Sequence, residues 1–278
     1  MEKRNKSGKA LVRRYGQWGL VAGAAEGIGA AFCEEMARQG LNVIMVDVKQ
    51  DEMTSLSNRL EKNYQVQVRN INLDLSREEA AETCMKIIEE HDCRLLVYNA
   101  AFSRVKPFLS ADPGELDLYI NVNTRTPLHL AYGFSQYLIR KKSAGGILLM
   151  ASLAGLWGTR LVATYSGTKA FNLLLAEALS FELKPYPLDV GACCAGATAT
   201  PGYLGTNPSQ GFPGPSVMQP AKVASYALRN LGRKTIIIPG FSNRMSYFLL
   251  TRLLPRSLSA KIVNSVMSRT YAYLGETL

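Results

Sequence analysis

The sequence is poor in the residues that bind metals and form disulfides. Its 278 residues include two histidines and five cysteines, and no two cysteines stand in a CxxC pair. The histidines, His91 and His129, are too far apart along the chain to suggest a zinc site, and an odd number of cysteines does not suggest a disulfide framework. We therefore expect no metal and no disulfide, and a reduced cytoplasmic setting.

Long apolar runs are also missing. The basic segment 1–15 is not followed by the apolar stretch of a signal peptide, and no stretch reaches the roughly 18 apolar residues needed to span a membrane. Yet 47% of the residues are hydrophobic and only 19% are charged, which excludes a disordered chain. A chain of this length can bury a large core, so we expect a single domain over residues 1–240.

Net positive charge is absent from the middle of the chain. The overall charge of +10 comes from residues 1–15, which carry +5, and residues 229–278, which carry +7, while the part between them carries −2. A protein that binds nucleic acid would place its basic residues on the folded body. We therefore do not expect nucleic acid as a partner.

Short apolar runs alternate with longer amphipathic segments from residue 18 to about residue 240. The apolar runs are typical of strands buried on both faces, and they cover residues 18–22, 42–46, 66–73, 95–98, 146–151, 188–194 and 235–238. The helical patterns cover residues 28–39, 51–63, 77–91, 116–140, 163–183 and 222–231. This alternation predicts an α/β fold, in which a doubly wound parallel sheet of about seven strands has helices on both faces.

Two segments break the alternation. Residues 196–220 hold five prolines and five glycines, which indicates a long loop or lid. Residues 241–278 combine apolar and basic positions and predict a C-terminal extension of one or two amphipathic helices, interrupted at Pro255. That tail could pack in a homo-oligomer, lie on an anionic membrane surface as a peripheral contact, or cap the sheet.

A glycine-rich turn follows the first expected strand and opens a helix, in the sequence Gly23-Ala-Ala-Glu-Gly27-Ile28-Gly29. Glycines allow a tight turn and let a pyrophosphate approach the backbone. The helix amino terminus then offers free N–H groups and a favourable dipole to the phosphates. The strand–turn–helix context predicts a dinucleotide site.

An acidic residue, Asp47, ends the second expected strand twenty residues after Gly27. A carboxylate there can accept hydrogen bonds from an adenosine ribose and repel a 2′-phosphate. Glu26 adds a second negative charge, no arginine stands nearby, and Lys49 is the one cation close in sequence. We therefore predict NAD rather than NADP as the cofactor, although Asp47 could instead simply begin a turn.

A group of polar residues in the middle of the chain suits acid–base chemistry. Tyr165 and Lys169 stand four apart at the start of a helical segment, so both lie on one face. A phenol titrates near pH ~10, and a neighbouring ammonium favours the phenolate. Ser152 closes the fifth expected strand and can orient a substrate oxygen, whereas Asn123, in the preceding long helix, can hold a water behind the lysine.

Taken together, these motifs resemble the short-chain dehydrogenase/reductase family over roughly residues 17–240. Asn123, Ser152, Tyr165 and Lys169 match its catalytic tetrad in order and spacing. The other matching elements are the glycine turn at Gly23, Gly27, Ile28 and Gly29, the pair Asp74-Leu75 where the family meets the adenine, the element Tyr98-Asn99-Ala100-Ala101, and Ala195-Gly196…Thr200. The departures are Ala22, Tyr98, Ala101 and Ala195, which put cofactor affinity rather than chemistry in question.

The resemblance implies a Rossmann fold and hydride transfer between NAD(H) and a secondary alcohol or ketone. Tyr165 would take the hydroxyl proton, and Lys169 would lower the pKa of the tyrosine and bind the nicotinamide ribose. Ser152 would hold the alcohol oxygen, and Asn123 would support a proton relay. Asn99 and Thr200 would contact the cofactor, Thr200 at the carboxamide. Homo-dimers or homo-tetramers built on the long helices are usual in the family.

The segments expected to face the substrate are apolar. Residues 102–109, 153–163 and the lid contain Phe102, Phe108, Leu153, Leu156, Trp157, Tyr203, Leu204 and Phe212, and their cations are Arg104, Lys106 and Arg160. This composition favours a steroid, a long acyl chain or an aromatic ketone, with one end suited to an anionic group. The alternatives are a 3-oxoacyl reductase that uses NADPH and a non-catalytic NAD-binding regulatory or scaffold protein.

Overall fold

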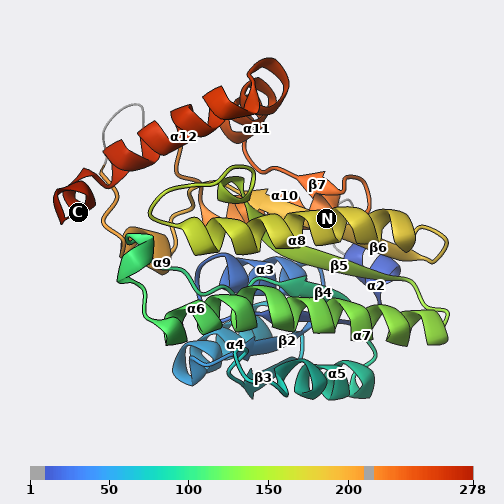
Figure 1. The fold of residues 1–278 in the computed structure, drawn as a ribbon. Coiled ribbons are helices and arrows are strands. Elements are labelled where there is room, and N and C mark those ends of the chain that lie inside the picture. Colours follow the sequence, from blue (N-terminus) through green and yellow to red (C-terminus); the bar gives the residue numbers. More distant parts are fainter. Residues whose placement is uncertain (1–9, 210–215, 278) are drawn as a thin grey trace.

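A seven-stranded parallel sheet forms the centre of the computed structural model, which describes residues 10–209 and 216–277 (Figure 1). The strand order is β3-β2-β1-β4-β5-β6-β7. The strands are β1 (Trp18–Ala22), β2 (Asn42–Asp47), β3 (Val68–Asn72), β4 (Cys93–Tyr98), β5 (Gly145–Ser152), β6 (Leu188–Ala195) and β7 (Ile236–Ile237). The predicted doubly wound parallel sheet is confirmed.

The strands are apolar because helices cover both faces of the sheet. All five residues of β1 are buried, as are residues 190–195 of β6 and seven of the eight residues of β5. The strand order reverses between β1 and β4, so the loops that leave these two strands part in opposite directions. Such a reversal leaves a crevice beyond the carboxyl ends of the strands, where α/β proteins bind their ligands.

Two separate hydrophobic cores lie on the two faces. One face carries α2 (Ala10–Tyr15), α3 (Gly27–Arg38), α4 (Gln50–Tyr64) and α10 (Pro220–Asn230). The other carries α5 (Ala80–Glu90), α7 (Thr126–Arg140) and α8 (Ala163–Glu182). Each helix contributes an apolar stripe to its core, which is the reason for the helical periodicity seen in the sequence.

The long helix predicted over 116–140 is not continuous. It consists of α6 (Pro113–Ile120), the π-helix η2 (Asn121–Arg125) and α7. α6 begins three residues earlier than expected because the Asp112 carboxylate caps it, accepting a hydrogen bond from the Glu115 amide at 3.0 Å. A π-turn leaves the apolar periodicity nearly intact, so the sequence pattern could not reveal it.

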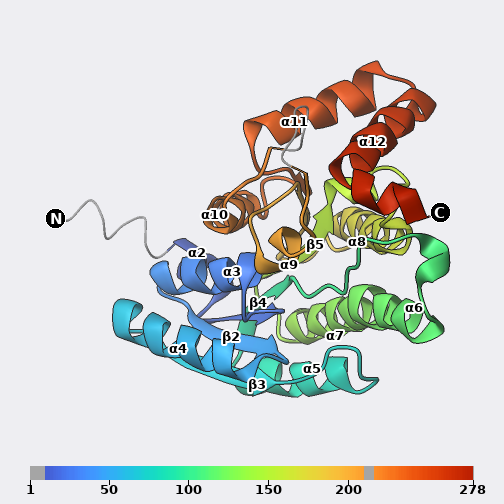
Figure 2. The ribbon, with the colours of Figure 1, turned by 90° about the vertical axis from the view of Figure 1, so that its left-hand side faces the viewer.

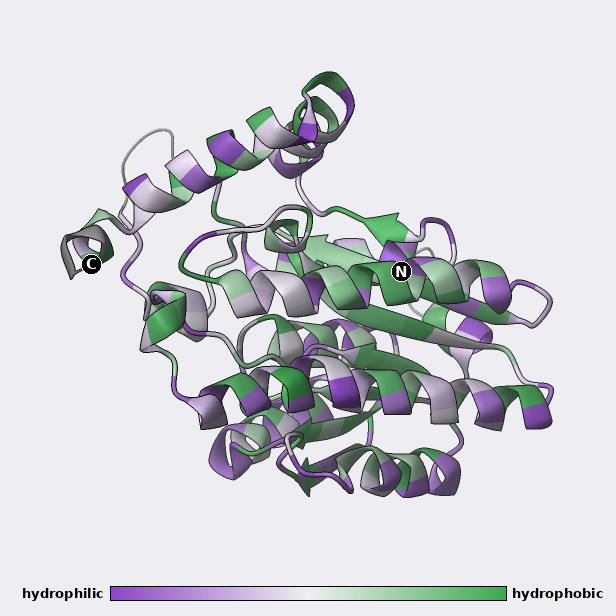
Figure 3. Ribbon diagram, in the orientation of Figure 1, coloured by the Kyte–Doolittle hydropathy of each residue, from purple (hydrophilic) through white to green (hydrophobic). Residues whose placement is uncertain are grey.

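The C-terminal extension stands outside the layers of the sheet and its helices (Figures 1 and 2). It comprises α11 (Phe241–Phe248), the π-helix η4 (Leu249–Leu253), α12 (Arg256–Thr270) and the 3-10 helix η5 (Ala272–Thr277), and Pro255 precedes α12 as predicted. Its helices mix apolar and polar residues along their length (Figure 3). Among the helices of the described residues, none combines the length and the hydropathy required to cross a membrane.

Part of the predicted lid lies within the described residues. It holds the short helix α9 (Pro201–Leu204) and an isolated bridge between Thr198 and Met218. Residues 210–215, which include the predicted substrate-facing Phe212, lie outside the described residues.

Candidate active site

The glycine turn lies at the carboxyl end of β1, where no larger residue would fit. Gly23 has φ +77°, and a Cβ there would lie 2.6 Å from the Ala100 backbone. A Cβ on Gly29 would lie 1.8 Å from the Gly23 carbonyl oxygen. The Asn99 side chain donates to that same oxygen at 2.7 Å. Asn99 therefore fixes the turn from the neighbouring strand β4.

The turn presents a helix amino terminus toward the crevice. Glu26 stands at the N-cap of α3 and its side chain makes no capping hydrogen bond, so the first N–H groups of the helix keep no side-chain partner there. Gly27 lies against the Thr200 side chain, 2.9 Å from the position a Cβ would take. A close backbone, a helix amino terminus and no bulky side chain fit the pyrophosphate of a nicotinamide cofactor.

Asp47, at the end of β2, holds the backbone of the glycine turn through a hydrogen bond. Its carboxylate accepts from the Ala25 amide at 3.0 Å and from the Lys49 amide at 3.1 Å. Lys49 is the one cation near Asp47 in the sequence, where it could favour the 2′-phosphate of NADP. Its ammonium donates to the Glu26 carboxylate at 2.7 Å. That ion pair raises the pKa of Lys49. The end of β2 thus combines two carboxylates with one neutralised cation.

Asp74 and Leu75, the predicted adenine contacts, follow β3. Asp74 is exposed, and its carboxylate accepts from the Ser76 amide at 2.8 Å. Leu75 is buried in the core, and its carbonyl accepts from the Thr126 hydroxyl at 2.8 Å. The loop is therefore attached to the start of α7, away from the tetrad.

Ser152, Tyr165 and Lys169 come together where β5 ends and α8 begins. Lys169 is 2% exposed, and its ammonium donates to the Met150 carbonyl at 2.7 Å and lies 5.6 Å from the centre of the Tyr165 ring. The Ser152 hydroxyl accepts from the Ala154 amide at 3.1 Å and donates to the Ala195 carbonyl at 3.4 Å. Ser152 is thus both the cap of a short turn and a hydroxyl beside the tyrosine.

Burial dominates the protonation of this group. Burial raises the pKa of Tyr165, while a hydrogen bond with the Ser152 hydroxyl acts in the opposite direction. Burial also lowers the pKa of Lys169 to about 8. The sequence led us to expect that Lys169 lowers the pKa of the tyrosine; in this structure, burial of the phenol raises that pKa, and the opposing contribution comes from the Ser152 hydroxyl.

Asn123 lies inside the π-helix η2 and is completely buried. Its side-chain oxygen accepts a hydrogen bond from the Phe102 amide at 2.7 Å. Its side-chain nitrogen donates to the Phe102 carbonyl at 2.9 Å and to the Thr168 hydroxyl at 3.1 Å. Asn123 therefore joins the loop after β4 to α8. A π-turn bonds each residue to the one five ahead, as the Thr126 amide does here with the Asn121 carbonyl.

Tyr98, noted in the sequence only as a departure from the family, and Asn172, which the sequence did not single out, support this turn from outside. The Tyr98 hydroxyl donates to the Val122 carbonyl at 2.6 Å, and the Asn172 amide donates to the Asn123 carbonyl at 3.0 Å. Tyr98 stands where the family has an asparagine, so this departure supplies a hydrogen bond of its own. Asn172 is 1% exposed and its side-chain oxygen has no partner. The sign of this role in the sequence was the amide of Asn172 itself, three residues after Lys169 in the same expected helix.

The loop after β5 is held by the C-terminal helix α12. Asn264 accepts from the Arg160 amide at 2.7 Å and donates to the Gly158 carbonyl at 2.9 Å. The Arg160 guanidinium donates to the Ser268 hydroxyl at 2.8 Å, and Arg256 donates to the Leu156 carbonyl at 3.2 Å. α12 therefore sets the position of one wall of the substrate site.

The lid is attached to the same extension. The Thr206 hydroxyl lies 2.8 Å from the Tyr271 hydroxyl, and Tyr273 donates to the Thr206 carbonyl at 2.7 Å. The Ser209 amide donates to the Thr270 carbonyl at 2.9 Å. Thr200 caps α9 by accepting from the Tyr203 amide at 3.1 Å, which places it between the glycine turn and the lid.

The three cations predicted to hold an anionic end of a substrate have partners within the chain. Lys106 pairs with Glu115 of α6, an acid outside the segments considered in the sequence. Arg104 lies over the Phe102 ring at 5.1 Å, and Arg160 is bonded to α12. Trp157 is buried, whereas Phe108 and Leu204 are exposed at the rim. The surroundings of the site are therefore more apolar than the sequence suggested.

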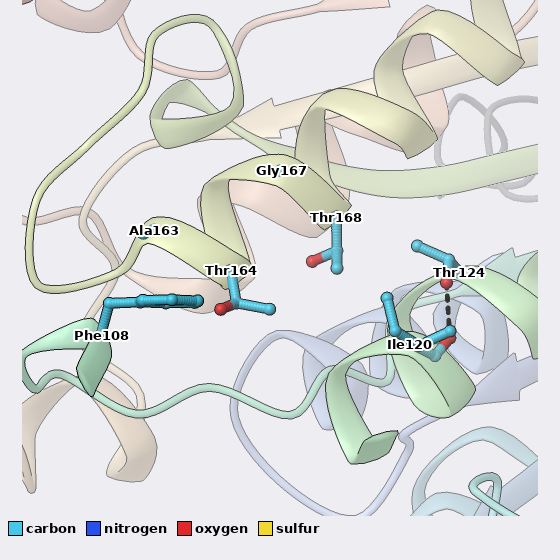
Figure 4. A pocket seen from close by; sticks show the side chains of 7 residues that line it. All are labelled: Phe108, Ile120, Thr124, Ala163, Thr164, Gly167 and Thr168. Atoms are coloured by element: carbon cyan, nitrogen blue, oxygen red, sulfur yellow. Dashed lines mark hydrogen bonds between the residues drawn. The ribbon is translucent and has the colours of Figure 1, made fainter. Parts of the chain in front are cut away.

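A separate pocket of about 460 Å³ opens beside the tetrad, between α6, η2 and α8 (Figure 4). It is lined by Phe108, Ile120, Thr124, Ala163, Thr164, Gly167 and Thr168. None of the four tetrad residues lines it. Thr168 connects the two regions, because its hydroxyl accepts the hydrogen bond from Asn123.

A family model of the short-chain dehydrogenases matches residues 17–209, and the chain belongs to that family. It is therefore an oxidoreductase that uses a nicotinamide cofactor. The chain is 30% identical to the 7beta-hydroxysteroid dehydrogenase of Collinsella aerofaciens over 85% of this chain and 90% of that one. It is 31% identical to a very-long-chain 3-oxoacyl-CoA reductase of Meyerozyma guilliermondii, over 80% of this chain and 66% of that one.

Solved structures show the same likeness. A 7beta-hydroxysteroid dehydrogenase structure superposes with a TM-score of 0.82 and 26% identity, covering 91% of this chain and 98% of that chain. A short-chain dehydrogenase from Sphingobium yanoikuyae, solved in complex with NADPH, gives a TM-score of 0.75 and 26% identity over 84% of this chain and 91% of that chain.

Proposed function

We propose that this oxidoreductase interconverts a secondary alcohol and a ketone on a rigid apolar ring compound of the hydroxysteroid class. The observation that carries the proposal is the attachment of α12 to the loop at 156–160, with Trp157 buried beneath it. The likeness to a 7beta-hydroxysteroid dehydrogenase supports it further, because that likeness covers 91% of this chain. A wall fixed by a distant helix suits a bulky, inflexible substrate better than a small one.

Each residue of the tetrad has a part in the chemistry. In the oxidation direction, Tyr165 in its phenolate form removes the proton from the alcohol oxygen, while Ser152 donates a hydrogen bond to that oxygen. The bound cofactor supplies the acceptor for the hydride that leaves the carbinol carbon. Lys169 holds positive charge behind the phenolate, and Asn123 keeps the loop after β4 against α8.

Among the two nicotinamide cofactors, NAD is the preferred one in this proposal. A 2′-phosphate at the end of β2 would meet the Asp47 carboxylate, and the nearby Lys49 ammonium is already paired with Glu26.

Glu26→Gln removes the ion-pair partner of Lys49 and should narrow the preference for NADH over NADPH about fivefold. This factor corresponds to the loss of an exposed ion pair of about 1 kcal/mol. Glu52→Gln, a neighbour on α4 that makes no hydrogen bond to Lys49, is the control. A parent enzyme that binds NADPH more tightly than NADH would refute the assignment.

A 3-oxoacyl reductase is the second candidate, and it is favoured by the likeness to the very-long-chain 3-oxoacyl-CoA reductase. A coenzyme A thioester would need cations at the entrance, and Lys106 and Arg160 have partners within the chain. We therefore rank it below the hydroxysteroid class. A protein that keeps the fold without turnover ranks lower still, because the tetrad is complete.

The decisive experiment is a panel of hydroxysteroids, ketosteroids and 3-oxoacyl thioesters, assayed with NAD(H) and NADP(H) and followed by mass spectrometry for products that differ by two hydrogens. Tyr165→Phe should lose at least about a thousandfold in turnover while cofactor binding stays unchanged. Turnover of the 3-oxoacyl thioesters without turnover of any steroid would identify the enzyme as a 3-oxoacyl reductase instead. Retained turnover in Tyr165→Phe would remove the tyrosine from its assigned role.

Assembly and location complete the proposal. Leu128 and Tyr132 of α7 and Leu174 and Phe181 of α8 are exposed, and such faces on two adjacent long helices suit a homo-dimer or homo-tetramer. Sedimentation velocity of Leu174→Glu against the parent tests this. All five cysteines are buried free thiols, which supports a reduced cytoplasmic setting.

A further inference from the structure

The C-terminal extension exposes a row of large apolar side chains. Phe241, Met245 and Phe248 recur at intervals of four and three residues, so they share one face of α11, and Leu249 and Leu253 follow in η4. Between 43% and 71% of each side chain is exposed, with Phe241 the most exposed. Monomeric proteins rarely leave such a continuous row uncovered, so this face has a binding role.

The charge around this row has a single sign. Residues 216–275 contain nine lysines and arginines and no aspartate or glutamate. None of these nine cations takes part in an ion pair with the carboxylates of residues 10–209. Within residues 10–209, by contrast, ten lysines and arginines form ion pairs with aspartates or glutamates. Unpaired cations next to exposed apolar side chains point to an external anionic partner.

A groove adjoins the row and continues its charge. It has a volume of about 580 Å³ and is lined by residues of α3, α10 and the first turn of α11. Arg38, Lys222, Arg229 and Arg244 line it, and Phe241 stands at its edge. Its one carboxylate, Glu35, is nearly buried and is already bonded to Arg38 and Gln39. The groove therefore has a surplus of positive charge.

We propose that the face formed by Phe241, Met245, Phe248, Leu249 and Leu253, together with this groove, docks the protein onto an anionic lipid bilayer. The apolar side chains would enter the boundary between headgroups and acyl chains, and the groove would hold lipid phosphates. This arrangement is that of an interfacial amphipathic helix, with aromatic and aliphatic residues on one side and arginines beside them.

The same observations disfavour a second copy of this chain as the occupant. Two copies meeting through this face would bring two sets of unpaired cations together without a carboxylate between them, and like charges in contact repel. The candidate face for self-association is instead on α7 and α8, where the exposed apolar residues are distant in sequence from this cluster of cations.

Flotation of the full-length protein with lipid vesicles tests the proposal. We expect at least tenfold tighter binding to vesicles of phosphatidylcholine with 30% phosphatidylserine than to phosphatidylcholine alone, and loss of most of this difference in 0.5 M NaCl. Phe248→Ser, and separately the pair Lys222→Gln with Arg252→Gln, should each weaken binding at least tenfold. Turnover of a water-soluble ketone should stay at the parent level in both, which shows that the variants fold.

Matched variants elsewhere on the surface distinguish binding through this face from nonspecific adsorption of the protein to vesicles. Tyr186→Ser removes an exposed apolar ring, and Lys62→Gln with Lys184→Gln removes two exposed cations; both should bind vesicles like the parent. Absence of vesicle binding, equal binding to neutral and anionic vesicles, or equal losses in the matched variants would each overturn the proposal. So would the dissociation of an oligomer by Phe248→Ser in a protein that does not bind vesicles, since the face would then join copies.

Discussion

The two halves of the active site are built in different ways. The cofactor half is held by neighbours at the edge of the sheet: Asn99, directly after β4, donates to the Gly23 carbonyl of the turn after β1, and Asp47 at the end of β2 accepts from the Ala25 amide. The substrate half depends on helices outside the sheet, because α12 holds the loop at 156–160 from more than a hundred residues away. The cofactor half is thus a property of the sheet, and the substrate half a property of how the extension docks.

This difference separates chemistry from specificity. Parallel strands align their carboxyl ends at one edge, so the glycine turn and the tetrad meet whenever the sheet forms. The walls around a substrate can then vary with the segment that docks on them, without disturbing the cofactor. Variants that damage one half should therefore leave measurable properties of the other half intact.

The largest effect is expected in the cofactor half. Gly29→Ala places a methyl group 1.8 Å from the Gly23 carbonyl oxygen, so the turn must move and the bond from Asn99 is lost. We expect the Kd for the cofactor to rise at least about a hundredfold, or roughly 3 kcal/mol. Isothermal titration measures it. Gly167→Ala, whose methyl group would meet open space on α8, is the control, and an equal loss there would disprove the steric explanation.

The lysine between the two halves should give the next largest effect, on stability. Burial holds the pKa of Lys169 at about 8, against 10.5 for a free lysine. Between these pH values the unfolded chain binds more protons than the folded one, so the free energy of unfolding of the parent rises with pH. Lys169→Met lacks this rise, and its stability relative to the parent should fall by about 3 kcal/mol from pH 7 to pH 10.5.

Urea unfolding at a series of pH values measures this difference. Lys62→Met, at an exposed position on α4, provides the baseline, since no such divergence from the parent is expected there. A difference between Lys169→Met and the parent that does not change with pH would mean that the Lys169 ammonium is not desolvated in the folded protein.

A smaller effect should follow from loosening the π-turn that joins the halves. Asn172→Leu keeps the volume but removes the side-chain donor to the Asn123 carbonyl, which belongs to a completely buried residue. We expect a loss of about 1–3 kcal/mol of stability and a kcat about tenfold lower, with unchanged cofactor Kd. Asn70→Leu removes an amide with an equally unpartnered oxygen from β3, far from the site, and should lower stability only. Equal kcat in the two variants would make the role of Asn172 purely structural.

The smallest effect is expected at the contact between α12 and the substrate loop. Asn264→Leu removes the bonds to Arg160 and Gly158, each worth about 1 kcal/mol, and should raise KM for a bulky ketone about fivefold while KM for a small ketone and the cofactor Kd stay constant. Ser265→Ala, an exposed position on the same helix, should change none of these. A uniform rise in KM for both ketones would show that α12 does not shape the wall selectively.

Much of the cofactor half could be predicted from the chain, because its signals are local. The glycine spacing, the acid that ends β2 and the four-residue interval between Tyr165 and Lys169 each lie within one turn or helix. The partners of Asp47 and Lys49 could not be predicted, since a carboxylate at the end of a strand can equally support the backbone or face a ligand. The direction of the pKa shift of Tyr165 also depended on burial, which periodicity does not quantify.

The substrate half was predicted only as a list of segments. Lys106 was expected to face the substrate, yet it pairs with Glu115, because α6 brings an acid from outside the segments considered. Asn123 was expected in a helix, yet that helix contains a π-turn held by Tyr98 and Asn172. A tyrosine in a strand and an asparagine in a helix carry no local sign of the carbonyl that they will bond.

The sequence by itself determined the layers of this protein and the position of the cofactor turn. Strand alternation, helical periodicity and glycine spacing act over a few residues, and the hydrophobic effect enforces them throughout the chain. Only the tertiary structure decided that α12 holds the loop beside Ser152, that Asn172 supports the carbonyl of Asn123, and that unpaired cations gather beside Phe241. These arrangements join residues far apart in the chain, and their partners are fixed by packing, which brings them together only once the sheet and helices have assembled.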